Sequence, residues 1–149
     1  MAEEIVGKVL SIALRSEDNG PMQEVTEVDA AEDGGLSGDV SSSPDRGITF
    51  LASEQWGEVT RELGVEIPWH TRRANVLVEA NRLGSLIGRT VSVGDIQVKI
   101  NAETKPCGLM DKLQAGLKDV LKPDCRAGVY GRIIRGGKLR VGDVVKAHA

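Results

Sequence analysis

The sequence predicts a mostly-β protein, a barrel of short strands with one or two short helices packed outside it. Gly accounts for 18 of 149 residues, about 12% against a usual ~7%, which indicates many tight turns. The apolar, β-branched stretches are short, roughly eight or nine in all, and turn residues separate them. They do not alternate regularly with helical stretches, as a parallel sheet would require. Closing into a barrel protects the edges of such strands.

Length and composition favour one domain over residues 1–149, because domains usually contain ~100–150 residues. No run approaches ~18 consecutive apolar residues, so no membrane span is expected. The first residues, Met-Ala-Glu-Glu-Ile, are acidic where a signal peptide is basic, which favours a cytoplasmic protein. The two cysteines, Cys107 and Cys125, are too few for a disulfide scaffold and should be reduced in that compartment.

The first third of the chain is predicted to contribute three strands. Residues 5–14 and 25–28 are apolar and β-branched enough for two of them, and Ile48–Ala52 for a third, buried one. Between them, the Asp-, Gly- and Ser-rich stretch 29–47 is predicted as a long loop. Such a loop inside a compact domain is either functional or mobile.

A helix is predicted over residues 54–63. Ser53 is a suitable N-cap, and Gly64 is a suitable stop signal. Trp56 lies on the apolar stripe of this helix and is therefore expected in the core rather than stacked on a ligand.

The second half is predicted to contain further strands, two hairpins and a second helix. A hairpin is predicted around Gly94-Asp95 and another around Gly136-Gly137, because alternating stretches flank both pairs. The predicted strands are residues 75–79, 90–93, 96–100, 129–134, 138–141 and 144–146, and a second helix is predicted over 111–121.

Charge is distributed unevenly along the chain. Residues 1–71 contain 4 basic and 15 acidic residues, and residues 72–149 contain 15 basic and 7 acidic ones. The basic half suggests an anion site, unless the two halves simply neutralise each other across the fold. Aromatic residues make up only 3% of the chain, which argues against a stacking surface for single-stranded nucleic acid. No nucleic-acid partner is expected.

Cys107 is the candidate nucleophile. It follows Lys105-Pro106 and precedes Gly108, just before a predicted helix. A nearby cation and the positive end of a helix dipole both favour the thiolate, which is the reactive form. The alternative is a buried, inert thiol. Cys125, between Asp124 and Arg126, is suited to resolving a sulfenate or persulfide on Cys107, or it is incidental.

Arg72 and Arg73 are candidates for binding phosphate or carboxylate, which arginine can grip with two nitrogens. In a strand the two would point to opposite faces, so at most one is expected to face a site. The alternative is that both are solvated.

No metal site is predicted. The possible zinc ligands lack suitable spacing, and the acidic stretch 29–33 lacks the order of ligands of a calcium-binding loop. Those zinc candidates are Cys107, Cys125, His70 and His148.

Taken in order, these motifs make the chain resemble a small, stand-alone MOSC domain, the module named after the C-terminal part of molybdenum-cofactor sulfurase. The resemblance runs over residues 4–146. The motifs that carry it are Gly35-Leu36-Ser37-Gly38-Asp39, Arg46-Gly47-Ile48-Thr49, Thr71-Arg72-Arg73-Ala74-Asn75, Val93-Gly94-Asp95, Lys105-Pro106-Cys107, Arg126-Ala127-Gly128-Val129-Tyr130-Gly131 and Val141-Gly142-Asp143.

The resemblance implies a barrel-like fold and a role in sulfur and molybdenum-cofactor chemistry. Cys107 matches a cysteine proposed in the family to carry sulfur as a persulfide or to meet the molybdenum. The other matching positions would line the ligand cleft, with Lys105 beside the cysteine. They are Gly38, Asp39, Arg46, Arg72, Arg73 and Asn75.

The resemblance also implies partners. The chain is too short to include a pyridoxal-phosphate desulfurase domain, so sulfur would come from a separate cysteine desulfurase or other donor and pass to a molybdoenzyme or cofactor acceptor. Two alternatives remain: a reductase component that acts on N-hydroxylated compounds with bound molybdenum cofactor, and a binding module without chemistry. Thiol reactivity and molybdenum content distinguish them.

Overall fold

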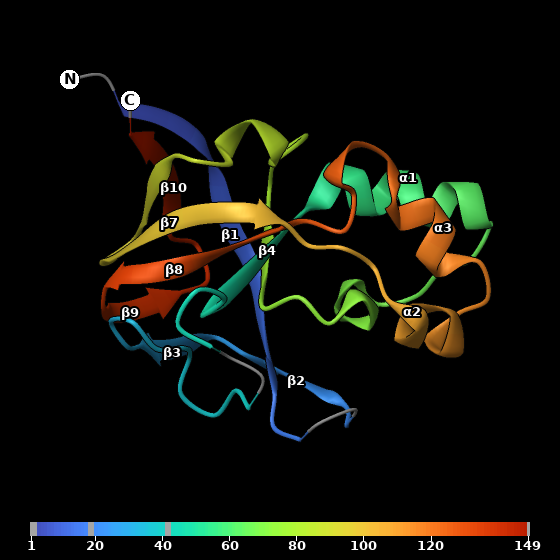
Figure 1. Cartoon of the computed structure of the whole chain (residues 1–149), viewed down its shortest axis with the longest axis horizontal. Helices are drawn as coiled ribbons and strands as arrows, with labels where there is room; N and C mark the ends of the chain where they lie inside the picture. The colour runs from blue at the N-terminus through green and yellow to red at the C-terminus, as the bar shows by residue number, and fades with distance from the viewer. Residues whose placement is uncertain (1–2, 18–19, 41–42, 149) are drawn as a thin grey trace.

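The computed structural model describes residues 3–17, 20–40 and 43–148, and its centre is a closed barrel of seven strands in the order β10-β6-β7-β8-β4-β5-β1 (Figure 1). The mostly-β barrel predicted from the sequence is confirmed. In these described ranges, no helix is long and apolar enough to cross a membrane. The strands are β1 (Glu3–Arg15), β2 (Met22–Val25), β3 (Glu27–Ala30), β4 (Ile48–Ala52), β5 (Val76–Val78), β6 (Thr90–Val93), β7 (Ile96–Glu103), β8 (Val129–Arg135), β9 (Gly137–Arg140) and β10 (Val144–His148).

Antiparallel pairing between β1 and β10 closes the barrel. Glu3 pairs with His148, and Lys8 pairs with Val144. Beyond a register shift near Gly7, the same long strand leaves β10 and pairs with β5 and then with β2. The pair β4–β5 is parallel. The first part of β1 therefore closes the barrel against β10, and its second part pairs with β5 and β2.

In the part of the chain that the structure describes, three α-helices and three 3-10 turns lie outside the barrel, and the α-helices gather on one side of it (Figure 1). They are α1 (Ser53–Leu63), α2 (Gly108–Leu113), α3 (Leu117–Leu121), η1 (Trp69–Arg72), η2 (Gly84–Leu86) and η3 (Pro123–Cys125).

The core has two parts, one inside the barrel and one between the barrel and the helices. Ile12, Ile48 and Ile133 belong to the first part, and Leu51 and Val59 to the second. All of β4 is buried, because one of its faces lines the barrel and the other packs against α1. Trp56 is only 8% exposed and lies in the second part, so its predicted core position is confirmed.

Several elements match their prediction. The strand Ile48–Ala52 has the predicted bounds. Helix α1 ends at Gly64 in a left-handed conformation, although it begins at Ser53 with Ala52 as its N-cap residue. The hairpin around Gly94-Asp95 forms as β6–β7.

Three other predictions are wrong. The single helix over 111–121 breaks into α2 and α3, because Gly116 adopts a left-handed conformation between them. The strand over 25–28 divides at Thr26 into β2 and β3, which belong to different sheets. The second hairpin does not form: β9 pairs with β3, whereas β8 pairs with β7 and β4. In the two strand errors a tertiary partner outweighs the local pattern, whereas the conformation of Gly116 breaks the helix.

Candidate functional site

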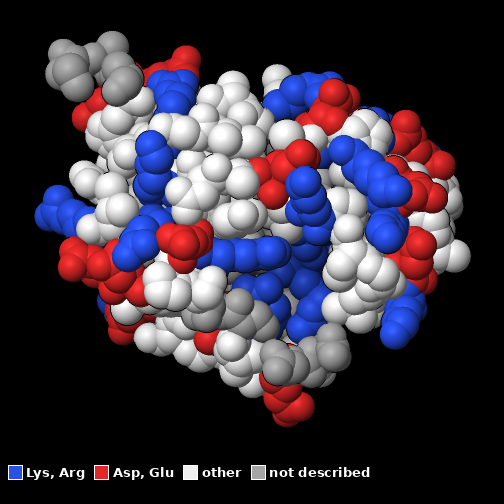
Figure 2. All heavy atoms as spheres, in the orientation of Figure 1, with Lys and Arg blue, Asp and Glu red and all other residues white. Residues whose placement is uncertain are grey.

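Three arginines and one cysteine define the candidate site. Arg15 ends β1, Arg46 precedes β4, Arg72 ends η1, and Cys107 is the N-cap residue of α2. They are close enough that the charges of Arg15, Arg46 and Cys107 all act on the guanidinium of Arg72. Figure 2 shows Lys and Arg side chains gathered in a recess of the face drawn. We call these four residues the arginine–cysteine cluster.

Arg72 is buried, with 5% of its surface exposed. Its Nε donates a 2.8 Å hydrogen bond to the carbonyl oxygen of Ala127, but its Nη2 has no partner among the described residues. Burial, together with the charges of Arg46 and Arg15 and against the opposing charge of Cys107, lowers the pKa of Arg72 to about 9. A buried guanidinium with an unused donor is costly unless an anion completes it.

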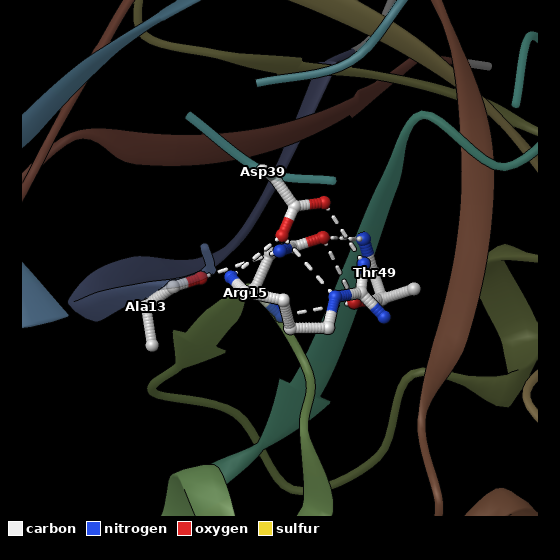
Figure 3. Close-up of polar contacts among 5 residues, drawn as sticks. Ala13, Arg15, Asp39 and Thr49 are labelled. Atoms are coloured by element: carbon white, nitrogen blue, oxygen red, sulfur yellow. Dashed lines mark hydrogen bonds and ion pairs between the residues drawn. The ribbon is translucent and has the colours of Figure 1, made fainter. Parts of the chain in front are cut away.

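Asp39 neutralises Arg15. Its carboxylate accepts hydrogen bonds from the backbone N (2.8 Å), Nε (3.2 Å) and Nη2 (3.0 Å) of Arg15 (Figure 3). The side chain of Asp39 is fully buried by this contact. Gly38, beside it, adopts a φ of +88°, a left-handed conformation that favours glycine. The Gly38-Asp39 turn therefore fixes Arg15, and through it one wall of the cluster.

Asn75 joins β1 to β4. Its Nδ2 donates to the carbonyl oxygen of Ala13 (3.2 Å), and its Oδ1 accepts from the backbone N and hydroxyl of Thr49, both at 3.1 Å. Its own backbone N donates to the Thr49 hydroxyl at 2.9 Å. Asn75 is fully buried. Three of these bonds engage both the oxygen and the nitrogen of its side-chain amide, so Asn75 fixes β1 and β4 relative to each other next to Arg15.

Arg46 lies over the ring of Tyr130, with Cζ 5.0 Å from the ring centroid. Burial lowers the pKa of Arg46, and the charge of Arg15 lowers it too, whereas Tyr130 and Cys107 raise it. Gly47, which follows Arg46, has no room for a side chain, because a Cβ there would overlap the carbonyl oxygen of Gly34. The backbone next to Arg46 therefore packs directly against the backbone of Gly34.

Arg132 ties the segment that carries Arg46 to the barrel. From β8, it donates to Asp33 (Nε, 2.7 Å) and to Asp45 (Nη1, 2.9 Å). Asn101 adds a 2.8 Å bond to the backbone carbonyl of Asp45. These contacts hold Asp33, near the start of the predicted loop 29–47, and Asp45, near its end. Residues 41–42 of this loop lie outside the described residues.

Arg72 and Arg73 diverge. Arg72 points into the cluster, whereas Arg73, in a left-handed conformation, donates to the carbonyl oxygen of Gly20. They lie at the end of a 3-10 turn rather than at the start of a strand. Lys105 is exposed and lines an open pocket together with Arg46 and Tyr130.

The two cysteines are both free and differ in exposure. Cys107 is exposed, whereas Cys125 is half-buried. Burial raises the pKa of the Cys125 thiol, and so do the charge and hydrogen bond of Glu103 and the charge of Asp124. Among the described residues, no three His, Cys, Asp or Glu side chains come together as metal ligands. His70 packs edge-on against Trp69, and His148 bonds to Ser92.

Sequence reasoning singled out neither Arg15 nor Tyr130. The signal for Arg15 is a basic residue that ends β1 directly after the apolar stretch Ile12-Ala13-Leu14. Tyr130 is the single tyrosine of the chain, but no local sequence pattern predicts its contact with Arg46.

Comparison with known proteins finds a family model, described as MOSC domain, that matches residues 37–146. No curated protein matches the chain. The YuaD protein from Bacillus subtilis has a similar structure, with a TM-score of 0.83 at 18% identity over 99% of this chain and 98% of that one. YiiM from Escherichia coli has a TM-score of 0.75 at 15% identity (95% and 70%), and YiiM from Geobacillus stearothermophilus has 0.72 at 14% (99% and 76%). At these identities the likeness is one of fold.

Proposed function

Because the chain belongs to the MOSC domain family, we propose that it is a molybdenum-cofactor-binding module in which Cys107 carries sulfur as a persulfide. The family's association with molybdenum-cofactor sulfurase supports the cofactor. The observation that carries the proposal is the buried guanidinium of Arg72, whose Nη2 has no partner in the described structure. It belongs to the same cluster as Cys107.

The donor set fits a ligand that carries a phosphate. Arg72 would donate through Nη2, and Arg46 would supply a second cation. Arginine suits this task because its planar fork matches phosphate oxygens. Asp39 cancels the charge of Arg15, so the cluster keeps a net positive charge from Arg46 and Arg72. The bound cofactor would supply a molybdenum centre, and this chain would hold its phosphate and exclude water around it.

Sulfur would reach Cys107 by thiol exchange. The Cys107 thiolate attacks the outer sulfur of a persulfide, R–S–SH, on the donor protein. A new S–S bond forms on Cys107 while the donor's S–S bond breaks, and the electron pair leaves with the donor thiolate. The proton stays on the transferred sulfur, so the step needs no external oxidant. A separate cysteine desulfurase is the proposed donor, a molybdoenzyme or cofactor acceptor is the proposed recipient, and the cytoplasm is the proposed compartment.

Alkylation of the two thiols tests the chemical role of Cys107. Because Cys107 is exposed whereas burial and Glu103 raise the pKa of Cys125, we expect iodoacetamide at pH 7 to label Cys107 at least tenfold faster, roughly the effect of one pKa unit. Mass spectrometry of the folded protein measures both rates. Labelling of Cys107 only after denaturation would remove the carrier role and leave a binding module.

Persulfide loading tests the transfer step itself. Incubation with a cysteine desulfurase and L-cysteine should add 32 Da to the wild type and to Cys125→Ser, as expected for one sulfur atom held on Cys107. The same treatment should leave Cys107→Ser unchanged. Sulfur on Cys125 alone, or on neither thiol, would contradict the proposal.

A further inference from the structure

An open pocket of about 600 Å³ lies beside the arginine–cysteine cluster. Arg46 forms part of both, because it lines the pocket and also acts electrostatically on Arg72. We call this pocket the vestibule. Its walls include Arg46, Ile87, Asn101, Glu103, Lys105 and Tyr130.

The vestibule holds cations that lack carboxylate partners. No ion pair joins Arg46 or Lys105 to an acid within the part of the chain that the structure describes. Most other arginines of the protein do have such a partner: these are Arg15, Arg82, Arg89, Arg126, Arg132 and Arg140. Glu103, the one acid on the vestibule wall, is outnumbered there by the two cations Arg46 and Lys105. The pocket is therefore suited to an anionic group.

The vestibule also has flat and apolar surfaces. The ring of Tyr130 lies under the guanidinium of Arg46, and both are planar groups on which another ring can stack. Ile87 is 38% exposed and supplies an apolar wall. A small pocket that combines apolar walls with a few polar anchors is typical of a site for an organic ligand.

We propose that the vestibule binds a small aromatic carboxylate. The ring would lie between Ile87 and the Arg46–Tyr130 pair, and the carboxylate would contact Lys105 and Arg46. This inference rests on the proposed function and extends it, because it adds a second ligand next to the arginine–cysteine cluster. Arg72 is not on the vestibule wall, so binding in the two parts can be disrupted separately.

Titration with benzoate, followed by amide NMR shifts, tests the proposal on the full chain. Benzoate should bind at least threefold more tightly than cyclohexanecarboxylate, which has the charge but no flat ring, because stacking on a guanidinium contributes about 0.5–1 kcal/mol at exposed sites. Benzamide, which has the ring but no charge, should not bind measurably. Equal affinity for benzoate and cyclohexanecarboxylate would overturn the aromatic part of the proposal.

Matched variants locate the ligand. Ile87→Asp should weaken benzoate at least fivefold by placing a like charge on the wall, whereas Ile134→Asp, equally exposed at 38%, should not. Lys105→Gln should also weaken it, whereas Lys112→Gln should not. Sulfate affinity should survive Ile87→Asp. If Arg72→Met abolished benzoate binding while Ile87→Asp and Lys105→Gln left it unchanged, the vestibule proposal would fail and the anion site at Arg72 would remain. If sulfate never bound but benzoate did, the proposed function would fail instead.

Discussion

At the scale of single residues, Arg72 has an unusual position for a cation. It is nearly inaccessible, has one carbonyl partner, and faces two other arginines rather than a carboxylate. Burying a charge without a partner is unfavourable to folding. The proposed function explains this position by anion binding rather than by a contribution to stability.

Replacing this arginine should therefore separate binding from stability. We expect Arg72→Met to lower sulfate affinity at least tenfold, because it removes the unpaired Nη2 donor, and to leave the free energy of unfolding unchanged or higher. Calorimetric titration and urea unfolding measure the two quantities. Arg73→Met is the control and should retain binding, because its side chain contacts Gly20 instead. A loss of more than about 2 kcal/mol of stability with intact sulfate binding would assign Arg72 a structural role.

The pKa of Arg72 gives the site a defined pH response. Burial lowers this pKa to about 9, so the side chain is charged at neutral pH and loses its proton as pH rises through that value. A bound anion favours the charged form. Sulfate affinity should then be constant from pH 7 to about 8.5 and fall above pH 9, by up to tenfold per pH unit.

Thermal shifts with and without sulfate measure this response, because sulfate remains a dianion over the whole range. Using the Cys107→Ser background removes the Cys107 side chain, which opposes the lowering of the Arg72 pKa. A sulfate-induced shift that stays constant to pH 10.5 would show that Arg72 does not titrate in this window.

The sequence anticipated only part of the site at this scale. Cys107, Arg46 and Arg72 could be proposed from motifs, and the argument that only one of Arg72 and Arg73 would face a site agrees with their divergence. Its premise was wrong, since the pair ends a 3-10 turn. Arg15 could not be found, because its burial depends on Asp39, 24 residues further along the chain.

At the scale of elements, residues 33–40 and 43–47 position Asp39 and Arg46, and Arg132 attaches both stretches to β8 through Asp33 and Asp45. Asp33 and Gly47 also donate backbone hydrogen bonds to Ile133 and Gly131 of β8. The two stretches are therefore both tied to a core strand. Their path sets the position of both Asp39 and Arg46.

Removing the side-chain attachment should loosen these stretches without unfolding the barrel. In Arg132→Gln, the amides of Asp33 and Gly47 should exchange hydrogen at least tenfold faster, and sulfate affinity should fall several-fold because Arg46 loses its support. Hydrogen exchange by mass spectrometry measures the effect. Lys138→Gln, which also loses two acidic partners but on β3, should change neither quantity. Equal acceleration across the whole barrel would indicate global destabilisation instead.

Strands were easier to predict than their partners. Alternation and turn residues located β4, β6 and β7 well, because those signals are local. No local sequence signal indicates that β9 pairs with β3 rather than with β8. The helix over 111–121 failed for a related reason: Leu113 fits an apolar stripe, yet it is 45% exposed once Gly116 turns the chain.

At the scale of the whole molecule, the seam between β1 and β10 makes the barrel continuous. Val145 of β10 is 2% exposed and faces the core, whereas its neighbour Val144 is 42% exposed. We expect Val145→Asp to lower the free energy of unfolding by about 3 kcal/mol or more, because it buries an unpaired carboxylate. Val144→Asp should stay within about 0.5 kcal/mol of wild type. Urea unfolding measures both, and equal effects would show that the seam is not part of the cooperative core.

The same seam constrains when the protein can complete its fold during synthesis. The first strand leaves the ribosome early, but its partner β10 is the last strand to emerge. Until then β1 and β6 both present open edges, and open edges invite pairing with other chains. The barrel therefore closes only after β10 has been made, and the interval before closure is the period in which a nascent chain is most exposed to misassembly.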